Sequence, residues 1–87
     1  MNPLNYTNIA SATTTTVKSG RGTLARIVIN TTAAGAITVY DNTAGSGTKI
    51  ATFPSNAVVG DYTFGCRFLT GLTIVTAAAS DITVVWE

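Results

Sequence analysis

Apolar residues recur at every second position in a series of short segments, and turn residues separate these segments. The segment 23–30 shows the pattern: one face carries Ala25, Ile27 and Ile29, and the other carries Leu24, Arg26, Val28 and Asn30. A period of two in a run rich in β-branched residues is typical of a β-strand with one buried face. We therefore expect a strand here, with its odd-numbered residues in the core.

The same pattern predicts several more strands. Strong segments are 36–41, 48–53, 61–69, 71–76 and 81–87, and weaker ones are 6–10 and 14–18. Pro54 removes a hydrogen-bond donor and ends one of them. Short strands at this spacing predict an all-β fold, a small β-sandwich of jelly-roll or immunoglobulin-like topology with six to eight antiparallel strands, and a small barrel is the alternative.

Two stretches of the chain resemble each other. Residues 27–40 align without gaps with residues 72–85, and each reads as strand, small-residue turn, strand. If the likeness is structural rather than a chance result of a Thr, Val and Ala vocabulary, each stretch is a hairpin and one lies in each sheet. We then expect Ile29, Val39, Ile74 and Val84 to meet in the core.

The first part of the chain differs from the rest. Residues 1–21 are richer in Asn, Thr and Ser, and the regular pattern begins after a small loop at 19–22. We expect an N-terminal arm or edge hairpin over 1–21, followed by a β-sandwich domain over 22–87. An arm of this kind adds a strand to a neighbouring subunit, whereas a hairpin stays with its own subunit.

The strand faces opposite the core are unusually apolar. Four residues on them are candidate contacts with other proteins: Val28, Tyr40, Val75 and Val85. Only 10% of the chain is charged, and we expect these charges mainly at turns and strand ends. A domain alone in water normally spreads charges of both signs over its surface. The composition therefore favours an assembly protein that other subunits cover, although isolated exposed valines are also ordinary.

Residues for catalysis are scarce. The chain has no histidine, so it cannot form a Ser-His-Asp or Cys-His arrangement. Asp41 and Asp81 stand where strands meet turns, where Asp usually bonds nearby backbone. The stretch 41–47 reads as a hairpin loop with glycines at positive φ, and it offers few carboxylate oxygens for calcium. We expect no enzyme activity, no cofactor and no metal site.

Partners other than protein are also disfavoured. A net charge of +1 with scattered cations does not suit nucleic acid. No run reaches the roughly 18 apolar residues of a membrane helix, and the start lacks the basic and apolar segments of a signal peptide. Cys66, the single cysteine, suits a reducing cytoplasm and a place in the core.

Several segments resemble a group of small proteins from tailed-bacteriophage genomes. They are Asn5–Ala10, Val17–Gly20, Arg26–Asn30, Ile37–Asn42, Gly45–Ala51, Gly71–Leu72 and Ile82–Val84, which together span most of the chain. The resemblance implies a virion structural protein made in the bacterial cytoplasm. It implies most specifically a capsid decoration (cement) protein on the capsid surface, which we expect to form a homotrimer and to bind the major capsid protein or other virion proteins.

A second hypothesis places the chain in a tail, baseplate or fibre, with a receptor-binding or carbohydrate-binding role. Sugars stack on aromatic side chains, and the candidates are Tyr40, Tyr62 and Trp86. Trp86 shares its face with Ile82 and Val84, which favours a place in the core instead.

Overall fold

The computed structural model describes residues 4–87, and these residues form eight β-strands. The strands are β1 (Asn5–Ile9), β2 (Thr14–Ser19), β3 (Gly22–Thr31), β4 (Ile37–Asp41), β5 (Thr48–Phe53), β6 (Gly60–Phe68), β7 (Gly71–Thr76) and β8 (Asp81–Trp86). Each range agrees with the predicted one to within a residue at either end. The period-two pattern therefore located every strand of the described chain, including the two weak ones.

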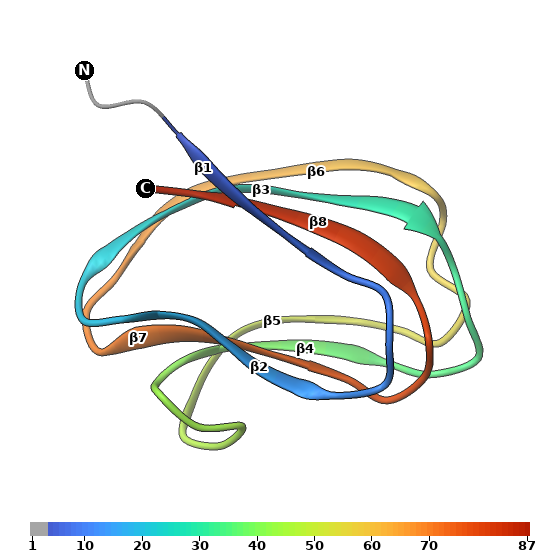
Figure 1. Cartoon of the computed structure of the whole chain (residues 1–87), viewed down its shortest axis with the longest axis horizontal. Coiled ribbons are helices and arrows are strands. Elements are labelled where there is room, and N and C mark those ends of the chain that lie inside the picture. Colours follow the sequence, from blue (N-terminus) through green and yellow to red (C-terminus); the bar gives the residue numbers. More distant parts are fainter. Residues whose placement is uncertain (1–3) are drawn as a thin grey trace.

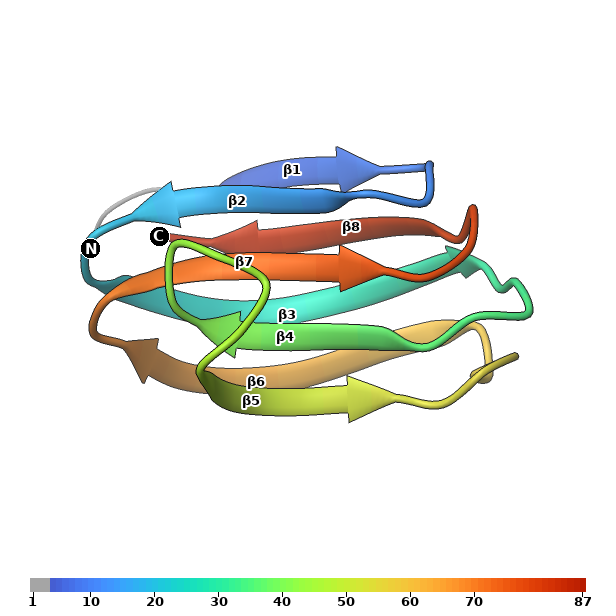
Figure 2. The ribbon, with the colours of Figure 1, turned by 90° about the horizontal axis from the view of Figure 1, so that it is seen from below.

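The strands form two antiparallel sheets that pack face to face, so the protein is a small β-sandwich (Figure 1). The first sheet has the order β1-β8-β3-β6, and the second has the order β2-β7-β4-β5. Figure 2 shows the second sheet in front of the first. The prediction of an all-β sandwich is confirmed. Residues 4–87 include no helix with the length and apolar character needed to span a bilayer.

The first two strands do not pair with each other as an edge hairpin. β1 pairs with β8 at the edge of the first sheet, and β2 pairs with β7 at the edge of the second. The chain passes between the sheets through the turn at 10–13. The segment 4–21 thus supplies one edge strand to each sheet of the described chain.

The two similar stretches are not hairpins, which corrects the expectation from sequence. β3 and β4 lie in different sheets, and so do β7 and β8, because each connection crosses from one sheet to the other. The crossings are built from small residues that allow close approach: a Cβ placed on Gly35 would lie 2.7 Å from that of Ala78. The two stretches lie side by side, since β3 pairs with β8 and β4 pairs with β7.

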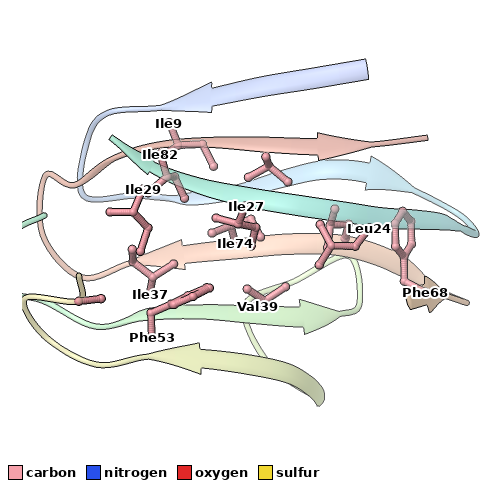
Figure 3. Packing of buried hydrophobic residues seen from close by; sticks show 13 residues of the cluster. Ile9, Leu24, Ile27, Ile29, Ile37, Val39, Phe53, Phe68, Ile74 and Ile82 are labelled. Atoms are coloured by element: carbon pink, nitrogen blue, oxygen red, sulfur yellow. The ribbon is translucent and has the colours of Figure 1, made fainter. Parts of the chain in front are cut away.

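The core lies between the sheets and is made of aliphatic and phenylalanine side chains (Figure 3). Its buried members are Ile9, Leu24, Ile27, Ile29, Ile37, Val39, Phe53, Ala57, Phe68, Leu72, Ile74, Ile82 and Val84. The expectation that Ile29, Val39, Ile74 and Val84 share the core is confirmed. Cys66 is partly buried and packs against this cluster.

Leu24 belongs to the core, which overturns its predicted place on the outer face. The register of β3 against β8 shifts between Leu24 and Arg26, so Ala25 is an extra residue in the strand. An extra residue reverses the alternation beyond it. Leu24 and Ile27 therefore face the core together although they stand three positions apart.

Candidate protein interface

The four predicted contact residues lie on the outer faces of the sandwich, but on opposite sides of it. Val28 on β3 and Val85 on β8 lie on the outer face of the first sheet, because their chain neighbours face the core. Tyr40 on β4 and Val75 on β7 lie on the outer face of the second sheet. All four are partly exposed. They form two separate patches, so no single flat partner contacts all of them.

The outer face of the first sheet, here called the first face, carries an apolar patch across three neighbouring strands. Val28 and Val85 stand on adjacent strands, one step apart diagonally, since Val28 is opposite Thr83. Tyr6 on β1 is directly opposite Val85 and is 75% exposed. Tyr6 therefore extends the patch to the edge of the sheet.

Tyr6 is a contact candidate that sequence reasoning missed. Its segment was a weak strand, and its face was not assigned. The available signal was that Tyr6 and Asn8 alternate with Thr7 and Ile9, which predicts Tyr6 on the outer side once Ile9 is in the core. The structure places Ile9 in the core and Tyr6 outward.

Polar side chains on the first face are tied to one another. The Nδ2 group of Asn8 donates to Asp81 Oδ1 at 2.8 Å, and that of Asn30 donates to Thr83 Oγ1 at 3.2 Å. These bonds hold the side chains in place around the valines. A surface that is already ordered loses little entropy when a partner covers it.

The first face also carries charge in the middle of a strand. Arg26 Nη1 lies 3.1 Å from Asp61 Oδ2, and both side chains are about half exposed. The expectation that charges gather at turns and strand ends is therefore wrong for Arg26. An exposed pair of this kind adds little to stability, at most about 1 kcal/mol. In the register Arg26 is directly opposite Val85 and Asp61 is directly opposite Val28, so the pair lies among the valines of the patch.

The outer face of the second sheet, here called the second face, is dominated by threonine. Its strands contribute Thr14, Thr16, Thr38, Thr52 and Thr73 around Tyr40 and Val75, with Lys49 on the edge strand. Threonine fits a pleated strand and needs no charge to face either water or protein. The absence of charge expected from the sequence thus describes the second face better than the first.

The loop between β4 and β5, residues 42–47, folds back over the second face. Figures 1 and 2 show it beneath the second sheet and crossing β7. Thr73 Oγ1 donates to the carbonyl of Asn42 at 2.7 Å, and Thr16 Oγ1 donates to that of Thr43 at 3.2 Å. Thr73 is fully buried as a result. Part of the second face is thus covered by the protein's own chain.

The carboxylate of Asp41 fixes the turn between β6 and β7. It accepts backbone hydrogen bonds from the N–H groups of Leu69 at 3.0 Å, Thr70 at 2.8 Å and Gly71 at 3.4 Å. The bonds from Thr70 and Leu69 lower the pKa of Asp41 below its usual value, because they favour the charged form. The role of this Asp is therefore structural, and it bonds a distant turn rather than its own loop.

The loop at 42–47 keeps its shape through its own polar groups. Asn42 Nδ2 donates to the carbonyl of Ser46 at 2.6 Å, and Asn42 Oδ1 accepts from the N–H of Thr43 at 2.8 Å. Gly47 has a φ of 97°, as expected for a loop glycine, whereas Gly45 does not have a positive φ. Within residues 4–87 no cluster of three or more metal-binding side chains and no pocket is present.

Two of the three aromatic candidates for sugar stacking serve the fold. The Tyr62 ring meets Phe53 edge to face, with centroids 4.9 Å apart, and its hydroxyl donates to the carbonyl of Val58. Trp86 packs against the core, and its Nε1 donates to Thr7 Oγ1 at 3.2 Å. Tyr40 is the candidate that stays on an outer face.

The fold defines the chain as a two-sheet β-sandwich, and comparison with solved structures finds the same fold in another protein. No known protein family and no curated protein sequence matches this chain. Among solved structures it is similar to the Drosophila NLP-core, whose crystal structure concerns pentamer formation and histone binding in that protein. The TM-score is 0.56 at 8% sequence identity, over 99% of this chain and 97% of the other. At this identity the likeness shows the shared fold alone.

Proposed function

We propose that this protein is a structural component of a tailed-bacteriophage particle, and most specifically a capsid decoration (cement) protein that binds and stabilises the shell of major capsid protein. The observation that carries the proposal is the apolar patch of Val28, Val85 and Tyr6 on the first face. The core is complete without these three residues. Their exposure is thus not explained by folding, whereas contact with a partner explains it.

The finer topology belongs to the same proposal, and we infer a jelly roll rather than an immunoglobulin-like sandwich. In the described chain, every connection except that between β4 and β5 passes from one sheet to the other. An immunoglobulin-like sandwich keeps more consecutive strands within a sheet. Jelly rolls are common in viral capsid proteins, which supports the assignment to a virion.

Binding is driven by burial of the first face. Each Å² of apolar surface removed from water contributes about 25 cal/mol, and the loss of rigid-body freedom offsets part of that gain. The ion pair of Arg26 and Asp61 lies among the valines of the patch, and together with the amide of Asn8 it fixes the orientation of the partner. A clamp of this kind holds neighbouring capsid subunits together against the pressure of packaged DNA.

The protein is expected to act as a homo-oligomer, and a trimer is the arrangement we propose. The structure of the Drosophila NLP-core concerns pentamer formation, which supports self-assembly by chains of this fold and makes five the competing number. Histone binding is not carried over. Histones are basic, and this chain has a net charge of +1 with only four acidic residues.

The alternative is a tail, baseplate or fibre component with a receptor-binding or carbohydrate-binding role. Tyr40 on the second face is the aromatic residue that supports it. The structural roles of Tyr62 and Trp86 leave this alternative with the weaker case. Loss of glycan binding on Tyr40→Ala, with the fold intact, would favour it.

Sedimentation of the purified chain with capsid shells that lack it tests the proposal. Wild-type protein is expected to sediment with the shells. Val85→Lys is expected to weaken binding at least tenfold, because it removes an apolar contact and places a second cation opposite Arg26. Thr52→Lys, on the exposed edge strand β5, is the matched control and is expected to bind normally.

Val85→Thr is a second variant that separates weakened binding from misfolding. It replaces one methyl group by a hydroxyl, adds no charge and suits a strand. It is expected to fold as the wild type does and to bind less tightly. Normal binding by both Val85 variants, or no binding by the wild type, would overturn the proposal.

A further inference from the structure

One edge of the sandwich lacks the features that normally protect sheet edges. The edges are β1 and β6 in the first sheet and β2 and β5 in the second. An edge strand has free N–H and C=O groups that readily pair with another strand, and proteins prevent this pairing with charges, bulges or proline. Comparing the four edges therefore shows which one is left open.

Three of the edges carry both a charged residue and an irregular register. The charged residues are Lys18 on β2, Lys49 on β5, and Asp61 and Arg67 on β6. The register shifts in the pairing of β2 with β7, of β5 with β4 and of β6 with β3. On β6 the irregularity includes Gly65, whose φ is 64°. Each of these edges is thus a poor template for a further strand.

β1 has neither feature. Its residues, Asn5–Ile9, are uncharged, and they pair with β8 without a shift from Asn5 opposite Trp86 to Ile9 opposite Ile82. Its length of five residues is ordinary for a strand. Figure 2 shows it outermost on its side of the molecule. Tyr6 on this edge is 75% exposed, and Leu4 just before it is 49% exposed.

We propose that β1 pairs antiparallel with β1 of a second copy of this chain about a twofold axis, which joins the two first sheets into one continuous sheet. We assign a second copy of this chain as the partner because its own β1 is also regular and uncharged. The other three edges of the described chain each present charged residues and a bulge. Two uncharged strands also meet without repulsion. The contact extends the apolar patch of the first face across the axis.

The register of this pair follows from which side chains face outward. Tyr6 and Asn8 face outward, so each must lie opposite an outward residue of the other copy. Pairing centred on Thr7 uses the whole strand and places Tyr6 opposite Asn8 of the second copy. It also places the two Thr7 residues opposite each other, a favourable cross-strand pair.

This contact is independent of any role in a virion, and it differs from a trimer contact. A twofold pairing gives a dimer, or a hexamer if two trimers are joined by it. Its prediction is therefore a particle with an even number of chains.

Light scattering during gel filtration of the full chain tests the proposal, with two matched double variants. Tyr6→Lys with Asn8→Lys places like charges opposite each other, and we expect it to halve the mass. Tyr6→Glu with Asn8→Lys places Glu opposite Lys, and we expect it to restore the wild-type mass. Both variants lose the same Asn8 hydrogen bonds, so a folding effect is shared. Thr63→Lys, exposed on the β6 edge, is expected to change nothing.

Three results would overturn the proposal. The first is a wild type that is monomeric, or odd-numbered, at every soluble concentration. The second is a wild-type mass for both double variants, which would place the contact elsewhere. The third is a halved mass for both, which would exclude the register centred on Thr7.

Discussion

Gly45 lies directly over Val75, so a Cβ placed on Gly45 would be only 2.8 Å from Val75 Cγ2. The contact joins a loop to the penultimate residue of β7, 30 residues further along the chain. The same Cβ would lie 3.2 Å from Thr14 Cγ2 on β2. The loop at 42–47 can therefore lie flat on the second face because residue 45 has no side chain.

Gly45→Ala is expected to destabilise the fold by about 1 kcal/mol, since the new methyl group overlaps Val75. The cost should largely disappear in a Val75→Ala background, because the clashing Cγ2 atom is gone. Chemical denaturation of the two single variants and the double variant measures this. An equal cost of Gly45→Ala in both backgrounds would show that the loop does not rest on Val75.

Asp41→Asn is expected to lower stability at neutral pH by roughly 1 kcal/mol, because the backbone donors of residues 69–71 lose a charged acceptor. Since the pKa of Asp41 is lowered in the fold from its usual 3.8, the carboxylate stabilises the fold fully above that value. This contribution is lost as pH falls through the folded pKa.

The difference between wild type and Asp41→Asn should therefore be constant from pH 7 to pH 5 and shrink in more acidic solution. Denaturation curves at several pH values give this difference, and the amide chemical shift of Thr70 reports the titration itself. A midpoint at or above 3.8 would contradict the assigned hydrogen bonds.

Leu24→Ala is expected to cost about 2–5 kcal/mol, because it leaves a cavity in the core. Val28→Ala on the outer face is the control and is expected to cost less than about 1 kcal/mol. Denaturation followed by the fluorescence of Trp86, the single tryptophan, measures both. A cost for Leu24→Ala as small as that for Val28→Ala would show that Leu24 lies on the outer face and that β3 has no extra residue at Ala25.

Tyr62→Phe removes one hydroxyl and with it the hydrogen bond to the carbonyl of Val58. The ring stays packed on Phe53, so we expect stability to fall by no more than about 1.5 kcal/mol. Amide hydrogen exchange should rise in the loop at 54–59 and stay unchanged in the loop at 42–47. Unchanged exchange at 54–59 would show that the hydroxyl does not hold this loop.

The sequence pattern was sufficient to locate the strands and most of the core, because both follow from local alternation. Ile29 and Val84 are buried as their periodicity predicted. Leu24 could not be predicted this way, since one extra residue at Ala25 reverses the alternation and leaves no mark in composition.

The pairing of strands was harder to predict from the sequence. Residues 27–40 and 72–85 have the composition of hairpins, yet each crosses between the sheets. A turn of small residues suits both paths, and the choice depends on which strands pair elsewhere in the chain. The covering of Val75 by Gly45 is likewise a contact distant in sequence.

The candidate interface was predicted only in part for the same reason. Alternation places Val28, Tyr40, Val75 and Val85 on outer faces, and the structure agrees. Alternation does not show which strands belong to the same sheet. The division of these four residues into two opposite patches therefore follows only from the strand order of the two sheets.

The proposal that this chain decorates a phage capsid is decided by cryo-electron microscopy of the particles produced from the genome that encodes it. We expect density for this β-sandwich on the outer surface of the capsid, with the first face turned toward a neighbouring protein. Density for the chain inside the tail tube, or a particle that lacks the chain, would contradict it.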